Sequence, residues 1–518
     1  MPERLSFLIV YTDQQQAYQL GCMGHPDLRT PNIDRLADQG VLFRRNYTPN
    51  TVCMPARHSL ITGLNPRGHR VLQNGCRSRS DVPTIPSILG AAGYRTHAIG
   101  KMHLEPTHLP PTYAAKDVRP EDFPEASALW FDGRIERLPL PYYGFQTVDF
   151  ANGHGDGVYG EYLTWLRKVD PQAEGLLSRD HPRRPPTGAW SSWKSSIPAE
   201  LHINRWVADR TIAFLKENAN SRQPFLCWTN FPDPHAPWCP SAPYDEMYDP
   251  AHVRLPADAV DPLPDRPQSV ASYVNNFLFA AVGPEQRSGA ALREITAHAL
   301  GMISHIDAEV GRILEVLDES NLRQNTVVIF MSDHGEMLGR RGLLMKGPFN
   351  VEEIIRVPLI VACPSRFAGR KSIASVTSSL DVPATILDLA HCNYPENEWA
   401  RSAAYLGLPN PLPGHTLAPI LEGQQERIRE RALVEYDEDY TGTTVRCRLR
   451  SLITEHHKLN YYAGEDWGEL YDLERDPEEH NNLWDVPQAR AIRADMMGNL
   501  ADEVIVSESW LPRRVTPC

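Results

Sequence analysis

The stretch Asn50-Thr-Val-Cys-Met-Pro-Ala-Arg-His-Ser-Leu-Ile-Thr-Gly63 holds the features around which the rest of the chain is organised. Pro55 suits the first turn of a helix, where its missing N–H leaves no hydrogen bond unmade. Residues 56–62 continue the helical pattern, and Gly63 is placed to end it. The pattern predicts Cys53 at the N-terminus of a helix, where free N–H groups and the helix dipole favour an anion.

Cys53 allows three interpretations. The first is a buried cysteine ahead of an ordinary helix, which is the commonest role of a free cysteine. The second is a thiolate nucleophile of phosphatase type, with Arg57 one turn further on as a cation beside the sulfur. That chemistry needs a phosphate-binding loop closed by a later arginine, and the chain has Ser59 there. The third interpretation depends on the pattern Cys-x-Pro-x-Arg and on the rest of the chain.

Length and composition limit the possibilities. With 518 residues, 42% of them hydrophobic and 23% charged, the chain is long enough for one large α/β domain and a smaller one. A formal net charge of −13 opposes nucleic acid or an anionic membrane as a partner. The nine cysteines are scattered, unlike a disulfide framework. The N-terminal apolar run is too short for a signal peptide, and no run could span a membrane. We therefore expect a cytoplasmic protein, although export by another route stays open.

Four predicted buried strands are each followed by polar or ionisable side chains. The strand at residues 7–11 precedes Asp13-Gln14, the strand after Gly93 ends in Lys101 and His103, residues 224–230 precede His235, and residues 326–331 precede Asp333-His334. In an open α/β sheet the ligand site lies outside the carboxyl ends of the strands. We therefore expect these residues to converge on one site.

Asp13, Gln14, Asp333 and His334 offer mainly oxygen ligands together with one imidazole. Such a set suits a hard divalent cation, with Ca²⁺ the first expectation and Mg²⁺ or Mn²⁺ still open. The sequence has no Cys/His cluster of zinc type.

The remaining pattern predicts an α/β fold with a large mixed, mostly parallel sheet sandwiched by helices. Predicted helices cover residues 31–39, 84–92, 199–217, 293–319 and 381–390, and further strands cover 41–47 and 357–362. Residues 104–198 and 239–289 have no clean periodicity and are predicted to be irregular insertions that shape a substrate pocket. We predict a catalytic domain over residues 1–412 and a smaller C-terminal α+β subdomain over 413–518, with strands at 431–436, 444–454 and 458–462 and a helix at 488–504.

Along most of its length the chain resembles the type I sulfatases, which depend on formylglycine and belong to the alkaline phosphatase superfamily. It also resembles their relatives, the phosphonate monoester hydrolases. The landmarks are Cys53-x-Pro-x-Arg57, Gly93-Tyr followed by Gly100-Lys-x-His103, Pro234-His-x-Pro237, Ser332-Asp-His-Gly335, Arg356-Val-Pro-Leu-Ile360 and Glu469-Leu-Tyr-Asp-Leu473 followed by Asp476-Pro477. Several landmarks in the family's order make chance agreement a poor explanation.

The resemblance implies an alkaline phosphatase-like fold and arylsulfatase-like hydrolysis of sulfate monoesters. A formylglycine-generating enzyme would oxidise Cys53, and the hydrate of the resulting aldehyde would be the nucleophile. The implied metal ligands are Asp13, Gln14, the hydrate at Cys53, Asp333 and His334. The other implied roles are Arg57 on the hydrate, Lys101 and Lys346 on the non-bridging oxygens, His235 with Lys346 at the leaving group, His103 as the base that expels sulfate, and Asn74 as a group that orients the substrate.

One residue departs from the sulfatase pattern. Gln14 stands where most sulfatases carry a second aspartate, which resembles the phosphonate monoester hydrolase branch, whereas Lys101 and His103 match the sulfatase pattern. We therefore expect sulfate ester hydrolysis with promiscuous cleavage of phosphonate monoesters and phosphodiesters. A phosphonate monoester hydrolase or phosphodiesterase as the main activity is the alternative.

Two further alternatives are a metal-dependent phosphatase that uses unmodified Cys53 or water, and a ligand-binding relative without activity. The sequence does not identify the leaving group of the small ester substrate. It also does not determine the oligomeric state, although a C-terminal arm could provide contacts in a homo-oligomer.

Overall fold

The computed structural model describes residues 4–184, 187–259, 288–367, 369, 371–395, 412–439 and 446–507. Residues 260–287 of the predicted insertion 239–289, and the first two residues of the strand predicted at 444–454, lie outside these ranges.

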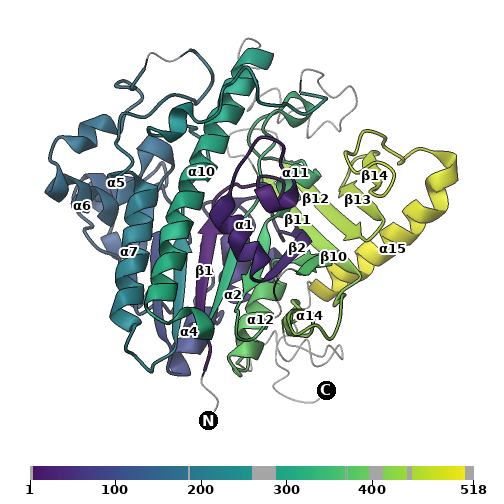
Figure 1. Cartoon of the computed structure of the whole chain (residues 1–518). Helices are drawn as coiled ribbons and strands as arrows, with labels where there is room; N and C mark the ends of the chain where they lie inside the picture. Colours follow the sequence, from purple (N-terminus) through teal and green to yellow (C-terminus); the bar gives the residue numbers. More distant parts are fainter. Residues whose placement is uncertain are drawn as a thin grey trace.

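A large mixed sheet forms the centre of the molecule (Figure 1). From one edge to the other its strands are β10 (Lys371–Ser378), β2 (Val41–Tyr47), β9 (Leu359–Ala362), β7 (Thr326–Ser332), β1 (Ser6–Thr12), β6 (Phe225–Asn230), β3 (Arg95–Lys101), β4 (Thr147–Asn152) and β5 (Tyr159–Gly160), and β8 (Arg356–Val357) pairs with β2. β7, β1, β6, β3 and β4 are parallel neighbours, whereas β9 is antiparallel to both β7 and β2.

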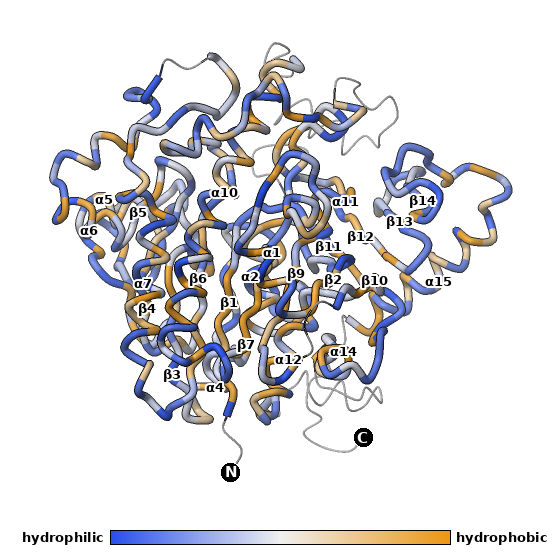
Figure 2. Tube along the Cα trace, in the orientation of Figure 1, coloured by the Kyte–Doolittle hydropathy of each residue, from blue (hydrophilic) through white to orange (hydrophobic). Residues whose placement is uncertain are grey.

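The central strands are buried along their whole length. Every residue of β1, β6 and β7 is buried, and Figure 2 shows these strands largely in the hydrophobic colours. A continuous apolar run is what a parallel strand needs when both faces of the sheet are covered. The runs at residues 7–11, 224–230 and 326–331 therefore predict these strands correctly.

Helices cover the sheet in two groups. α1 (Pro31–Asp38), α7 (Ile203–Asn218) and the long α10 (Gly289–Glu319) pack together on the sheet (Figure 1), and α2 (Cys53–Thr62), α4 (Ile85–Ala91) and α12 (Asp381–Leu389) pack together as a second group. Further helices are α3 (Pro66–His69), α5 (Ser127–Phe131), α6 (Glu161–Val169), α11 (Glu352–Ile355) and α14 (Ala418–Leu421). The five helices predicted from periodicity are all present, which confirms the predicted α/β class.

A smaller antiparallel sheet follows near the C-terminus. Its strands are β11 (Arg431–Asp439), β12 (Arg446–Thr454), β13 (His457–Tyr462) and β14 (Gly468–Asp472), and α15 (Arg490–Ser507) packs against it at one side of the molecule (Figure 1). The predicted α+β subdomain is present, while its boundary near residue 412 stays a prediction.

The prediction of an irregular segment at 104–198 is wrong in part. This segment contains α5, α6 and two strands, and β4 joins the main sheet in parallel with β3. The β4 sequence Thr-Val-Asp-Phe-Ala-Asn alternates and is short, so it lacks the apolar run that marks the other central strands.

Among the described helices, none combines the length and the apolar character that a membrane span needs. The cytoplasmic location stays a prediction.

Candidate active site

The carboxyl ends of the parallel strands meet at one edge of the sheet. The register pairs Thr12 with Ser332 and Tyr11 with Asn230, so β1, β7 and β6 end at the same level. Asp13 and Asp333 leave the sheet side by side there, and the Gln14 N–H donates to Asp333 Oδ1 at 2.9 Å. The structure thus brings together the strand-end residues that the sequence places far apart.

A glycine turn fixes Asp333 and His334. The Gly335 N–H donates to the Ile354 carbonyl oxygen at 2.7 Å, and a Cβ at position 335 would overlap the Glu353 carbonyl oxygen. His334 Nδ1 lies 2.9 Å from the Gly335 carbonyl oxygen and is bonded to it, which leaves Nε2 directed at Cys53. Only glycine permits this close turn, so the Asp-His-Gly run has a structural cause.

Cys53 is the first residue of α2. Val52 before it is extended, and Gly63 ends the helix with φ 74°, as the sequence predicts. Asn74 Oδ1 accepts from the Met54 N–H at 3.1 Å, so Asn74 satisfies one of the free N–H groups of this helix end. Its predicted part in substrate binding stays a prediction.

The Cys53 sulfur is buried among charged groups. Sγ lies 3.2 Å from His334 Nε2, 3.3 Å from Lys346 Nζ and 3.9 Å from Asp13 Oδ1. Burial raises the pKa of the thiol, but Lys346, His334 and Lys101 together hold it well below its usual value. The surroundings therefore favour an anion at this position.

Arg57 joins the two carboxylates. Its Nε donates to Asp333 Oδ2 and its Nη2 to Asp13 Oδ2, both at 3.1 Å, and Nη1 donates to the Lys101 carbonyl oxygen at 2.9 Å. Arg57 therefore orients the two carboxylates. Its contact with the hydrate, which the resemblance implies, stays a prediction.

Lys101 and His103 lie at the end of β3, on one side of the site. Lys101 is fully buried, and its Nζ is bonded to Asp13 Oδ2 and to His154 Nε2. The strand ends at Lys101, and His103 adopts a positive φ of 49°, so the expectation that both side chains extend from one strand is wrong. Burial lowers the pKa of His103, and the neighbouring Cys53 offsets part of that shift.

Lys346 and His235 form the opposite side. Lys346 Nζ lies 2.9 Å from His235 Nε2 and donates to Gln14 Oε1 at 2.5 Å. Burial and the neighbouring Lys346 lower the pKa of His235 to about 4. The imidazole is therefore neutral near pH 7 and accepts from the lysine ammonium.

The ionisation of Asp13 and Asp333 differs. Burial raises the pKa of Asp13, but Lys101 and Arg57 outweigh it and hold that pKa below its ordinary value. Burial and the charge of Asp13 raise the pKa of Asp333. Two buried carboxylates this close favour a bound cation between them.

The residues present fit a divalent metal. Asp13, Cys53, Asp333 and His334 each offer a ligand atom, these atoms lie within 4.8 Å of one another, and all four residues are buried. Carboxylate oxygens and an imidazole suit a hard divalent cation, whereas a thiolate suits softer metals. If an oxygen replaced the Cys53 sulfur, the ligand atoms would be oxygens and one imidazole nitrogen, which suits a hard cation better.

Two residues of this site, His154 and Glu336, were not predicted from the sequence. His154 stacks on His235 with ring centroids 3.6 Å apart, and Glu336 is buried and bonded to the Gln14 amide. Glu336 directly follows the Asp-His-Gly run, so its place in the sequence could have marked it as a candidate site residue. His154 lies between two glycines after the unrecognised strand β4, and nothing in its local sequence marks it.

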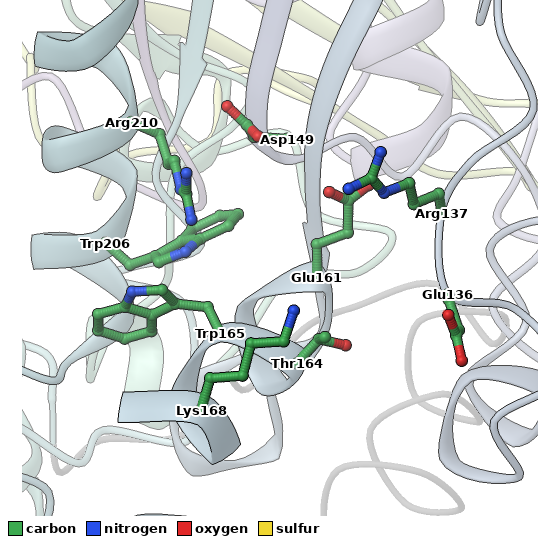
Figure 3. A pocket seen from close by; sticks show the side chains of 9 residues that line it. All are labelled: Glu136, Arg137, Asp149, Glu161, Thr164, Trp165, Lys168, Trp206 and Arg210. Carbon is green, nitrogen blue, oxygen red and sulfur yellow. The ribbon is translucent and has the colours of Figure 1, made fainter. Parts of the chain in front are cut away.

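A cavity of about 240 Å³ lies beside β4, α6 and α7, away from the strand-end residues (Figure 3). Trp165 and Trp206 lie close together in it, and side chains of both charge signs surround them. Its lining includes none of the predicted site residues.

Comparisons with known proteins agree with this geometry. The family model described as sulfatase matches residues 6–392, and the model described as N-sulphoglucosamine sulphohydrolase, C-terminal, matches residues 341–505. The multifunctional alkaline phosphatase superfamily protein PehA of Trinickia caryophylli is 29% identical over 95% of this chain and 93% of its own length. The uncharacterized sulfatase YidJ of Escherichia coli (strain K12) is 28% identical over 96% of this chain and 87% of its own.

Among solved structures, the phosphonate monoester hydrolase of Agrobacterium radiobacter superposes with a TM-score of 0.78 at 25% identity, over 97% of this chain and 96% of that one. The mostly parallel α/β sheet and these relatives are consistent with the alkaline phosphatase superfamily. Within that superfamily, the chain belongs to the sulfatase family, whose members act with a metal.

Proposed function

We propose that this protein hydrolyses sulfate monoesters in the manner of an arylsulfatase, with Cys53 oxidised to formylglycine as the nucleophile. We also propose that the same site cleaves phosphonate monoesters and phosphodiesters as secondary substrates. The observation that carries the proposal is the position of Cys53. It begins a helix, and its sulfur lies within 4 Å of Asp13, His334 and Lys346.

The charge of the site supports an anionic substrate. Lys101, Lys346 and Arg57 bring three cations into a buried region of a chain with a net charge of −13. Fixed cations in a site that excludes water stabilise charge that develops on a transferred sulfuryl group. A divalent cation, Ca²⁺ first, held by Asp13, Gln14, Asp333 and His334 would help to ionise the hydrate hydroxyl and to offset that charge.

The chain's own residues then fit a two-stage reaction. The formylglycine hydrate would supply the nucleophilic oxygen that displaces the leaving group from sulfur. Lys346 with His235 would give a proton to the leaving oxygen as its bond to sulfur breaks. His103 would take the proton of the second hydroxyl, so that the carbon–oxygen bond to sulfate breaks, the aldehyde forms again and water restores the hydrate. This division replaces one difficult hydrolysis by two easier steps.

A phosphonate monoester hydrolase is the second candidate for the main activity. It is favoured by Gln14, which places a neutral amide where a second aspartate would add negative charge, and by the similarity to the Agrobacterium radiobacter enzyme. Lys101 and His103 favour the sulfatase instead.

A comparison of two substrates with the same leaving group separates these candidates. Protein produced together with a formylglycine-generating enzyme is assayed with 4-nitrophenyl sulfate and with a 4-nitrophenyl phosphonate monoester. We expect the larger kcat/KM for the sulfate. A larger value for the phosphonate would make the second candidate the main function, and no turnover of either ester by the formylglycine form would contradict both.

A further inference from the structure

Glu336 is a buried carboxylate with no assigned role, next to the predicted metal ligand Gln14. Only about 2% of its surface is exposed. Its Oε1 accepts from the Leu338 N–H at 3.1 Å and from the Met345 N–H, and its Oε2 accepts from Gln14 Nε2. Both oxygens thus act as hydrogen-bond acceptors for N–H groups.

These contacts determine which way the Gln14 amide faces. Glu336 accepts hydrogen bonds from Nε2, whereas the Lys346 ammonium can only donate and lies 2.5 Å from Oε1. The reverse orientation would set N–H groups against the ammonium and oxygen against the carboxylate. The same ammonium lies 3.3 Å from Cys53 Sγ, so Gln14 Oε1 faces the reacting centre.

Glu336 is itself held in place by the backbone of the segment that carries Lys346. Met345, whose N–H it binds, directly precedes that lysine. Gln14 is fixed on its other side by its own N–H, bonded to Asp333. The Glu336 carboxylate therefore links the end of β1 to the Lys346 segment through the Gln14 amide.

We propose that Glu336 is a positioning residue that holds the Gln14 amide with its oxygen towards the metal site, and that the two side chains form a matched pair. This inference rests on the metal-binding part of the proposed function, and it concerns neither the ester that is hydrolysed nor the modification of Cys53. It predicts that a change between amide and carboxylate at Gln14 alone or at Glu336 alone weakens metal binding. The two changes made together should restore it.

The reason is the balance of donors and acceptors. In Gln14→Glu, two carboxylates face each other in a buried site, and like charges repel strongly there. In Glu336→Gln, the new side chain keeps its oxygen on the Leu338 and Met345 N–H groups and turns its NH₂ towards Gln14. Gln14 must then rotate and present its own NH₂ to the cation. In the double variant, the new amide at position 336 donates to the new carboxylate at position 14, whose second oxygen faces the metal.

The test is a set of four proteins, namely the wild type, Gln14→Glu, Glu336→Gln and the double variant. All are produced without a maturation enzyme, so that Cys53 is the same thiol in each, and are freed of metal with a chelator. Ca²⁺ binding is then measured by isothermal titration calorimetry, with Mn²⁺ as a second probe. Loss of a residue that orients a ligand weakens metal binding by about tenfold to a hundredfold. We expect that loss in each single variant, and affinity within about threefold of the wild type in the double variant.

The matched control is Glu309→Gln, the same change at a buried glutamate on α10 whose partners are Arg205 and Arg312. It should leave Ca²⁺ affinity unchanged. If a single variant fails to fold, a folded double variant with wild-type affinity still supports the pairing. Unchanged affinity in Glu336→Gln, or a double variant that is unfolded or binds no better than the weaker single variant, would overturn it. Since no ester is present, these results do not depend on the substrate proposed above.

Discussion

Replacing Arg57 by leucine should destabilise the metal-free protein strongly. Arg57 is buried and is bonded to Asp333, Asp13 and the Lys101 carbonyl oxygen at 3.1, 3.1 and 2.9 Å. Leucine keeps much of the volume but leaves two buried carboxylates without this cation. Breaking one partner out of a buried ion pair costs about 3–5 kcal/mol.

The loss in the free energy of unfolding should lie near the lower end of this range, because both carboxylates keep other partners. Asp13 keeps Lys101 as a partner, and Asp333 keeps the N–H groups of Gln14 and His334. We expect a decrease of about 3 kcal/mol in the free energy of unfolding, or slightly more.

The assay is urea unfolding followed by tryptophan fluorescence and circular dichroism, in the presence of EDTA. The control is Arg119→Leu, because Arg119 forms an exposed ion pair with Asp122 and should produce no measurable change. A decrease below about 1 kcal/mol for Arg57→Leu, the range of exposed ion pairs, would refute the assignment of Arg57 as the cation that holds the two carboxylates.

Three further predictions concern the site and the core. Cys53→Ala should lower kcat by about a thousandfold or more, because it removes the nucleophile, whereas Cys227→Ala in β6 should remain active, and equal activity of both variants in the ester assay would contradict the role of Cys53. Prolonged treatment with a chelator should abolish ester hydrolysis, and added Ca²⁺ or Mn²⁺ should restore it; activity that survives with no metal detectable by mass spectrometry would exclude a metal mechanism. Burial lowers the pKa of His202 from 6.5 to about 4, so the unfolded chain takes up this proton first as the pH falls, and stability that is present above pH 6.5 is lost towards pH 4. His202→Gln should therefore flatten the dependence of Tm on pH between these values, and an unchanged slope would show that His202 does not contribute to it.

Sequence reasoning predicted the elements whose physical cause is local. Continuous apolar runs predict β1, β6 and β7, and the Cys53 helix with its terminal Gly63 follows from proline and glycine preferences. The strand-end residues were grouped correctly because parallel strands finish at a common edge.

Features that depend on distant contacts could not be predicted. β4 is a strand because it pairs with β3, although its own sequence alternates. The stacking of His154 on His235 requires that strand to be in place. The partners of Arg57 depend on the spacing between Asp13 and Asp333, which only the register of β1 with β7 determines.

The central claim is that an oxidised Cys53 is the nucleophile of a metal-dependent ester hydrolase. The most direct measurement is the mass of the tryptic peptide of residues 46–57, from active protein produced with a formylglycine-generating enzyme, together with its reaction with a hydrazide. We expect a peptide at the mass of the aldehyde that forms a hydrazone, in an amount that follows ester hydrolysis across preparations. An unmodified thiol in protein that still hydrolyses esters would contradict it and would favour a metal phosphatase that works with unmodified Cys53 or water.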